Sequence, residues 1–404
     1  MASTVKQGAV KRRRVFYIPG YDPFPPRRYR ELYRKESALQ AEISGYDISI
    51  APNPDGENFG WSVDAMIDGV QTKTEVEVLV WSDIVQRSMS ASIFVTYVRL
   101  VKTSWIYTRS GALFRLAKTR KGPVIAALYP IFMLLLQLAV ALLIGWGIGA
   151  VVALLHPMLG WVAAGLTIII LLHWFRKLDG KIFAYYLMQD YAHSAQHDGA
   201  TPPALAERLG EFQNYVTDSL RSDVDEVLIV GHSSGAHLAV MMLTAMLRSG
   251  RVPADGPVLS FLTLGHVVPM VSFLPKADCL RRDLREMSEQ ALIPWVDVTA
   301  PGDGCAFALC DPVAVTGVAR EAKKWPLVFS AAFTQSLSAE RWASLRWRFF
   351  RLHFQYLCAF DRPRDYDYFQ ITAGPKTLWD RYRDRVPSRS RLETPLSGYR
   401  SVAE

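Results

Sequence analysis

Cysteine is scarce in this chain. Among its 404 residues there are only four cysteines, and no two of them form a C-x-x-C pair. Because cysteine metal sites and redox motifs depend on such spacing, we expect no metal site, and the spacing gives no disulfide framework either, which suits a reducing compartment. The first residues also lack the apolar run of a secretory signal peptide, so we expect none.

Charge is absent from one long stretch. Residues 122–175, 54 residues in all, contain no Asp, Glu, Lys or Arg. A membrane-spanning helix needs about 20 apolar residues, so this stretch is long enough for two. We expect a first span from Val124 to about Leu154, a turn at 156–160 and a second span from Trp161 to Phe175. The alternative is a buried hairpin in a soluble protein, which so long an uncharged stretch disfavours.

Basic residues flank the uncharged stretch on both sides, whereas its turn carries no charge. They are Arg115, Lys118, Arg120 and Lys121 before it, and Arg176, Lys177 and Lys181 after it. Because positive charge is retained on the cytoplasmic side, we expect an integral protein of a bacterial inner membrane with both of its ends in the cytoplasm. Residues 88–117 mix apolar and basic side chains and are expected to form helices that approach the membrane.

The chain has a formal charge of +8 and a short basic run at residues 11–14. A nucleic-acid arm is one interpretation of such a run, but no partner motif accompanies it. A solvated segment near anionic lipid fits better, so we expect no nucleic-acid partner.

The clearest signal for chemistry is the sequence GHSSG at residues 231–235. Its two glycines make Ser233 the central residue of a G-x-S-x-G pattern. A short apolar strand is expected before it, at 226–230, and an apolar helix after it, at 236–243. This context is typical of a nucleophile elbow, in which a serine sits on a sharp turn between a strand and a helix. The alternative is an ordinary junction with a serine as helix cap.

With these flanks the chain resembles the α/β-hydrolase family, on both sides of the uncharged stretch. The resemblance implies an α/β fold, a mostly parallel sheet flanked by helices and here interrupted by a two-helix transmembrane hairpin. It divides the chain into the N-terminal part of a hydrolase domain (1–121), the hairpin (122–175), the C-terminal part of that domain (176–380) and a polar tail (381–404) that we expect to be loose.

The resemblance also implies a catalytic triad in the chain order Ser, Asp or Glu, His. Of the eight histidines, only His353 lies far enough downstream to follow a separate acid. The expected acid is Asp303, in a loop after the strand expected at 294–299, where members of the family place theirs. Asp311 is the runner-up, and Asp297 lies within the strand and is expected to be structural. The alternative for His353 is a partly buried histidine among aromatic residues.

The family builds its oxyanion hole from the residue after the nucleophile and from the loop after an early strand. Here that implies the amides of Ser234 and of Tyr21, which follows Gly20 and the strand expected at 15–18. A simple Pro-Gly turn is the alternative for this loop.

These roles together imply a membrane-anchored serine hydrolase that cleaves an ester or thioester through an acyl-enzyme. No metal and no organic cofactor is needed for that chemistry, and the expected partners are the bilayer and an acyl-ester or lipid substrate. Two other hypotheses remain, an acyltransferase and a non-catalytic interaction protein that keeps the fold.

Overall fold

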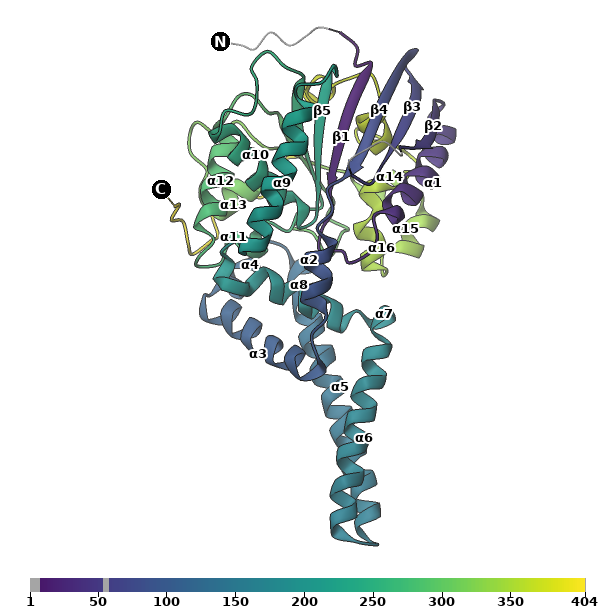
Figure 1. Cartoon of the computed structure of the whole chain (residues 1–404), viewed down its shortest axis with the longest axis vertical. Coiled ribbons are helices and arrows are strands. Elements are labelled where there is room, and N and C mark those ends of the chain that lie inside the picture. The colour runs from purple at the N-terminus through teal and green to yellow at the C-terminus, as the bar shows by residue number, and fades with distance from the viewer. Residues whose placement is uncertain (1–7, 54–57, 404) are drawn as a thin grey trace.

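The computed structural model describes residues 8–53 and 58–403, and it is an α/β structure built on one eight-stranded sheet (Figure 1). The strands are β1 (Arg12–Ile18), β2 (Asp47–Pro52), β3 (Gly60–Ile67), β4 (Val70–Val78), β5 (Glu226–His232), β6 (Val258–Leu264), β7 (Trp295–Thr299) and β8 (Leu327–Ser330). Their order across the sheet is β2-β3-β4-β1-β5-β6-β7-β8.

The strands from β4 to β8 along this order are all parallel, whereas β3 pairs antiparallel with both β2 and β4. From β1 the chain crosses to the far edge at β2, returns inward through β3 to β4 beside β1, and then adds β5 on the other side of β1. The order therefore reverses between β1 and β5. In open parallel sheets the crevice outside the carboxyl ends of such strands is where ligands bind.

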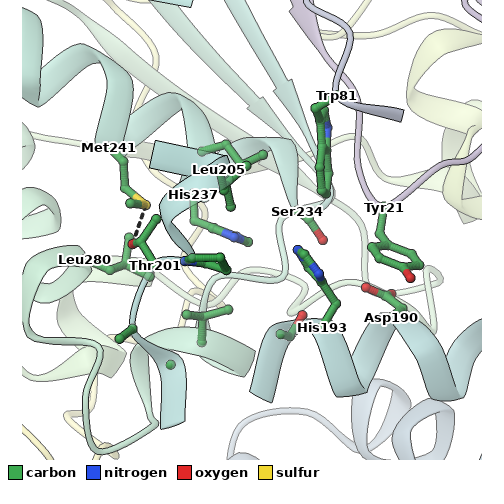
Figure 2. A pocket seen from close by; sticks show the side chains of 16 residues that line it. Tyr21, Trp81, Asp190, His193, Thr201, Leu205, Ser234, His237, Met241 and Leu280 are labelled. Atoms are coloured by element: carbon green, nitrogen blue, oxygen red, sulfur yellow. Dashed lines mark hydrogen bonds between the residues drawn. The ribbon is translucent and has the colours of Figure 1, made fainter. Parts of the chain in front are cut away.

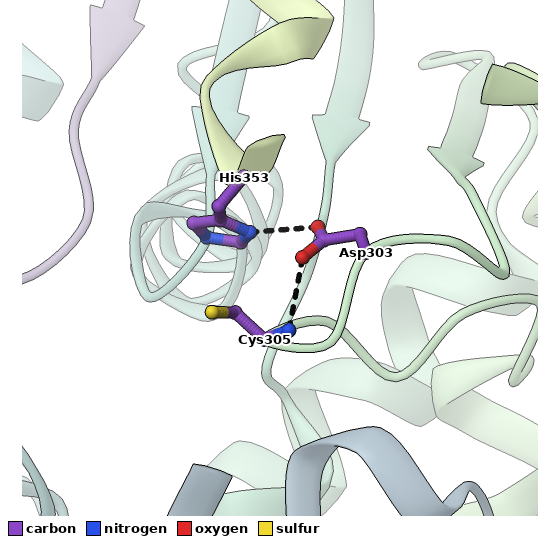
Figure 3. A group of neighbouring side chains, drawn as sticks. All are labelled: Asp303, Cys305 and His353. Carbon is purple, nitrogen blue, oxygen red and sulfur yellow. Dashed lines mark hydrogen bonds and ion pairs between the residues drawn. The ribbon is translucent and has the colours of Figure 1, made fainter. Parts of the chain in front are cut away.

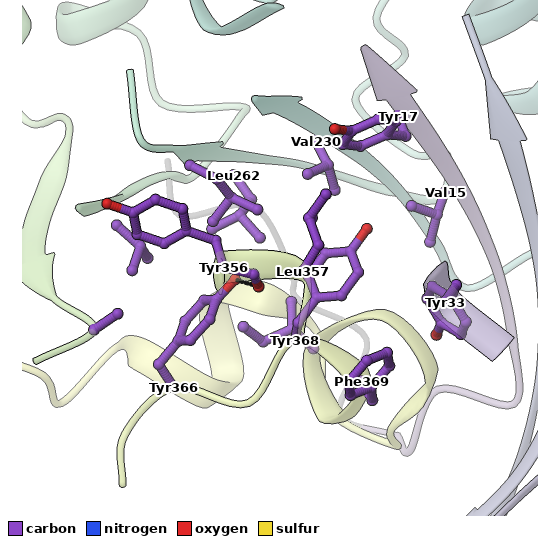
Figure 4. Packing of buried hydrophobic residues seen from close by; sticks show 14 of the residues in the cluster. Val15, Tyr17, Tyr33, Val230, Leu262, Tyr356, Leu357, Tyr366, Tyr368 and Phe369 are labelled. Carbon is purple, nitrogen blue, oxygen red and sulfur yellow. Dashed lines mark hydrogen bonds between the residues drawn. The ribbon is translucent and has the colours of Figure 1, made fainter. Parts of the chain in front are cut away.

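Each face of the sheet is covered by an apolar core. Successive side chains of one strand point alternately into the two cores. In β1, Val15 and Tyr17 belong to one core, and Phe16 and Ile18 belong to the other. Figure 4 shows the first core, where aromatic side chains from the C-terminal third of the chain pack against Val15, Val230 and other strand residues.

The helices form three groups. The first sheet face is covered by α1 (Arg27–Ser44), α14 (Phe333–Ser336), α15 (Ala339–Leu345), α16 (Phe349–His353), η2 (Gln355–Leu357), α17 (Tyr368–Ala373) and α18 (Leu378–Tyr382). The second face is covered by α2 (Ser82–Met89), α9 (Pro203–Ser219), α10 (Gly235–Arg248) and α12 (Asp278–Glu289). A third apolar cluster joins α3 (Ile93–Arg109), α4 (Ala112–Leu116), α8 (Ala184–Ala195), α11 (Pro269–Ser272) and α13 (Pro312–Thr316) to the start of α5, with η1 (Gln196–Gly199) following α8.

Two helices, α5 (Lys121–Ala153) and α6 (Pro157–Lys177), project from this body as a hairpin (Figure 1), joined back to it by α7 (Asp179–Ile182). Both are long and apolar enough to cross a membrane. At about 1.5 Å per residue, α6 matches a hydrocarbon core of about 30 Å, whereas α5 is longer by about twelve residues. The first part of α5 therefore extends past the end of α6 into the body, where it contacts α4 and α8.

Close contact between α5 and α6 depends on glycine. A Cβ atom on Gly149 would lie 2.9 Å from the Cβ of Ala164 and 2.9 Å from the carbonyl oxygen of Gly160. A Cβ on Gly145 would lie 2.6 Å from a side-chain carbon of Ile168. By contrast, a Cβ on Gly147 would meet nothing within 4 Å, because that residue faces away from α6.

The described part of the last segment, residues 381–403, is attached to the body by hydrogen bonds. The expectation that this tail is loose is therefore wrong. Leu392 bonds with Leu309, Leu396 and Ser397 donate to the carbonyl of Val315, and the Ser401 carbonyl accepts from the buried guanidinium of Arg281. These bonds attach the segment to the body, although its composition is polar.

We expect Gly149→Leu to destabilise the hairpin by about 1–3 kcal/mol, the usual cost of overpacking. Gly147→Leu is the matched control, since both changes gain the same helix propensity. The melting temperature of the detergent-solubilised protein should fall for the first variant and stay level or rise for the second. Equal melting temperatures for the two variants would contradict the packing argument.

Candidate active site

The turn between β5 and α10 holds Ser233 in an unusual backbone conformation. Its φ is +57°, in the left-handed region that residues other than glycine rarely adopt. The glycines on either side are required by close packing, because a Cβ on Gly235 would lie 2.1 Å from the carbonyl oxygen of Ile18, and a Cβ on Gly231 would lie 2.7 Å from that of Gly235. Backbone strain of this kind persists where the surrounding structure enforces it, as in nucleophile elbows.

An imidazole–carboxylate pair lies at the same edge of the sheet (Figure 3). Nδ1 of His353 is 2.7 Å from Oδ2 of Asp303, and both side chains are buried. Asp303 follows β7, and His353 is the last residue of α16, beyond β8. The carboxylate also accepts hydrogen bonds from the amide of Cys305 at 2.9 Å and from the hydroxyl of Tyr356 at 3.1 Å.

The charge of Asp303 is stabilised although the residue is buried. Burial acts to raise the pKa of this carboxyl, but the charge of His353 and the hydrogen bonds from His353, Cys305 and Tyr356 outweigh it, so that the pKa lies below its ordinary value. An ionised carboxylate at Nδ1 keeps a proton on that nitrogen. The other ring nitrogen, Nε2, is then the one that can accept a proton.

Nε2 of His353 is buried and has no hydrogen-bond partner among the residues that the structure describes. His353 and Ser233 line the same cavity, whose volume is about 820 Å³. This volume lies within the range of about 300–1,000 Å³ that is usual for ligand pockets. The structure therefore brings the predicted nucleophile, base and acid to one edge of the sheet, where Ser233 and His353 line the same cavity.

His232, next to the serine, holds the segment of the candidate base His353 in place. Its Nε2 donates to the backbone carbonyl of His353 at 3.0 Å, and its Nδ1 accepts from the hydroxyl of Tyr17 at 3.2 Å. Burial, followed by the charge of His353, lowers the pKa of His232 to about 3, so the ring stays neutral. Sequence reasoning missed this role, because its partner lies 121 residues away and no local pattern marks it.

The loop after β1 passes directly over the serine. A Cβ on Gly20 would lie 2.8 Å from the Cβ of Ser233, so only glycine allows this approach. Among the described residues, the amides of Tyr21 and Ser234 have no hydrogen-bond acceptor. The loop itself is fixed from outside, since Trp81 donates to the carbonyl of Pro19 at 2.9 Å and Tyr186 donates to that of Tyr21.

The other acids that were considered lie elsewhere. Asp311 caps α13 by accepting from the amides of Val313 and Ala314, and it is 2.6 Å from Nζ of Lys323. Asp297 accepts from the hydroxyl of Thr263 at 2.6 Å inside the sheet. Each of these contacts is structural, and neither acid bonds to His353.

Cys305 lies beside the pair (Figure 3), so that potential ligand atoms of Asp303, Cys305 and His353 fall within 4.8 Å of one another. A metal would require the thiolate form of the cysteine. Burial, together with the charges on Asp303 and Asp190, raises the pKa of this thiol well above its ordinary value. In the structure, His353 and Asp303 form a hydrogen-bonded pair beside a neutral thiol.

A smaller pocket lies behind the elbow, lined by Tyr21, His193, Ser234 and Asp190 among others (Figure 2). Asp190, on α8, lines both this pocket and the larger cavity. Its Oδ1 has no hydrogen-bond partner among the described residues. Burial raises the pKa of Asp190 to about 7, against a smaller opposite effect of the charge on His353.

The raised pKa of Asp190 predicts a pH-dependent stability. The folded protein keeps this proton up to about pH 7, whereas an unfolded aspartate loses it near pH 4. Raising the pH from about 4 to 7 therefore removes stability. We expect Asp190→Asn to melt above the native protein at pH 8, with the gap narrowing at pH 5 and closing near pH 4. Asp255→Asn, at an exposed loop position, should follow the native profile. A constant gap at all pH values would contradict the prediction.

Comparisons of the chain with models of protein families, with curated proteins and with solved structures find no match. The assignment of a function therefore depends on the residues and geometry of this site.

Proposed function

We propose that this protein is a membrane-anchored serine hydrolase that cleaves an ester or thioester. One observation carries the proposal: His353 has its Nδ1 on the buried carboxylate of Asp303 and an unpartnered, buried Nε2, and it lines the same cavity as Ser233. An orienting acid, a base with a free nitrogen and a strained serine are the components that nucleophilic acyl transfer requires.

The proposal includes an α/β-hydrolase-like fold. Its support is the parallel part of the sheet, with the candidate serine, acid and base following β5, β7 and β8 in that order along the chain. This is the order Ser, Asp, His of that family. The reversal of strand order between β1 and β5 adds independent support, because the candidate site lies outside the carboxyl ends of those two strands.

In the first half of the reaction, Oγ of Ser233 attacks the substrate carbonyl carbon while Nε2 of His353 takes the hydroxyl proton. Asp303 keeps the ring in the required tautomer and stabilises the imidazolium that forms. The amides of Tyr21 and Ser234 donate to the oxyanion of the tetrahedral intermediate. Loss of one such donor typically lowers the rate by about 10²–10³. The proton then passes from His353 to the leaving alcohol or thiol as its bond to the acyl carbon breaks.

In the second half, His353 takes a proton from water, and the resulting hydroxide attacks the acyl-enzyme. The carboxylic acid product leaves, and His353 returns the proton to Oγ of Ser233. His232 takes no part in these transfers, because it stays neutral and its ring nitrogens are bonded to Tyr17 and to the backbone of His353.

We also propose that α5 and α6 anchor the enzyme in a bacterial inner membrane with the body in the cytoplasm. The length and apolarity of both helices support the anchoring. The basic residues at the two outer ends of the hairpin support the orientation.

The position of the nucleophile can be tested by covalent labelling. A fluorophosphonate reacts with an activated serine, so Ser233→Ala should abolish labelling of the detergent-solubilised protein. Ser234→Ala should still be labelled, because only the backbone amide of that residue takes part. Labelling that disappears in Ser234→Ala and persists in Ser233→Ala would place the nucleophile at the neighbouring position.

The acid can be identified by comparing two aspartates. Asp303→Asn should lower turnover of p-nitrophenyl butyrate by about 10⁴, since the amide favours the wrong tautomer of His353. Asp311→Asn should leave most of the turnover, with a lower melting temperature because a helix cap and an ion pair are lost. Both variants must retain the fold in a melting experiment. Full turnover in Asp303→Asn would refute the assigned acid, and full turnover in His353→Ala would refute the triad.

A further inference from the structure

The membrane hairpin is part of the catalytic cavity. The cavity that holds Ser233 and His353 is also lined by Ile125, Ala126 and Tyr129, from the first turns of α5. It is also lined by residues 347–351, at the start of α16. A helix that crosses the membrane thus forms one wall of the site at its other end.

A second element, α3, presents an apolar face beside the hairpin. Phe94, Val98, Val101 and Trp105 recur at helical spacing and are 76%, 49%, 67% and 64% exposed. The opposite face of α3, which includes Leu100, is buried in the body. In Figure 1, α3 lies at the end of the body from which α5 and α6 project, and it contacts α6.

A row of large apolar side chains is unfavourable in water, and next to membrane-spanning helices the bilayer is what covers it. Exposed apolar side chains continue along α5, with Ile125 and Phe132 both 64% exposed. The bilayer surface therefore lies against the end of the body where α5 forms the cavity wall.

Charge on the cavity lining indicates which molecule is taken from that surface. Lys181, Arg348 and Arg351 line the cavity and are exposed. Two acids, Asp22 and Asp190, also line it. Asp22 is buried and already accepts from the hydroxyl of Tyr29 at 2.7 Å, and burial raises the pKa of Asp190 to about 7. The exposed charge on the lining is therefore positive, and aromatic side chains such as Phe350 and Phe354 supply apolar lining.

We propose that the substrate is an anionic glycerophospholipid that enters the cavity directly from the bilayer. This inference rests on the proposed hydrolase function. The acyl chain occupies the apolar lining, and Arg348, Arg351 and Lys181 bind the phosphate. The Ser233 Oγ–acyl bond forms as the ester C–O bond breaks, and His353 passes the serine proton to the lysophospholipid oxygen. Water then releases the fatty acid from Ser233.

The test uses the full-length protein reconstituted into vesicles of dioleoyl phosphatidylcholine, with or without dioleoyl phosphatidylglycerol. Released oleate is measured, and p-nitrophenyl butyrate serves as a water-soluble reference ester. We expect oleate release from phosphatidylglycerol that requires Ser233. The ratio of lipid to reference turnover should fall about tenfold in Arg348→Gln/Arg351→Gln, the loss of about one charge-assisted phosphate contact. It should also fall in Val101→Glu/Trp105→Glu.

The matched control is Leu292→Glu, an exposed apolar residue before the amino end of β7, away from the cavity, which should change neither activity. Ser233-dependent cleavage of the reference ester without oleate release would overturn the lipid substrate and leave the hydrolase proposal intact. Equal cleavage of phosphatidylcholine, or an unchanged ratio in the double arginine variant, would overturn the selection for anionic lipid. Absence of both cleavage and fluorophosphonate labelling would instead refute the proposed function.

Discussion

The site depends on keeping one buried carboxylate ionised. Asp303 is only 2% exposed, and a charge removed from water to that extent is costly unless its oxygens are bonded. Three segments converge to satisfy it: the turn that contains Cys305, the last residue of α16, and Tyr356 just beyond it. Tyr356 in turn accepts from the amide of Ala300 at 2.9 Å, so the loop after β7 and the segment after α16 hold each other. The position of the imidazole follows from this network rather than from any one bond.

The elbow and the acid–base candidates could be found in the sequence because each has a local signal or a fixed order along the chain. Ser233 lies between two glycines, and Asp303 lies in a loop after an apolar strand. The structure puts Asp303 and His353 in contact, while their catalytic roles stay predictions.

Features that depend on contacts between distant segments could not be found in this way. The bond from His232 to the backbone of His353 has no signature in either segment. The packing of the last residues depends on acceptors such as the carbonyl of Val315 and not on their own apolarity. The contribution of α5 to the cavity was hidden for a similar reason. Its sequence is uniformly apolar, so nothing in it separates the turns that line the cavity from the rest of the helix.

The first turns of α5 extend past the end of α6 and connect the hairpin to the cavity. The helix extends from the tip of the hairpin to Lys121, with Pro130 inside it, and α6 packs closely on its distal part at Gly145 and Gly149. In the proposed membrane topology, one end of α5 is in lipid and the other lines the cavity that Ser233 also lines, so a tilt of the helix would move Ile125 relative to the elbow. Helix tilt responds to the thickness of the surrounding hydrocarbon. In that topology, the width of the cavity is mechanically linked to the thickness of the bilayer.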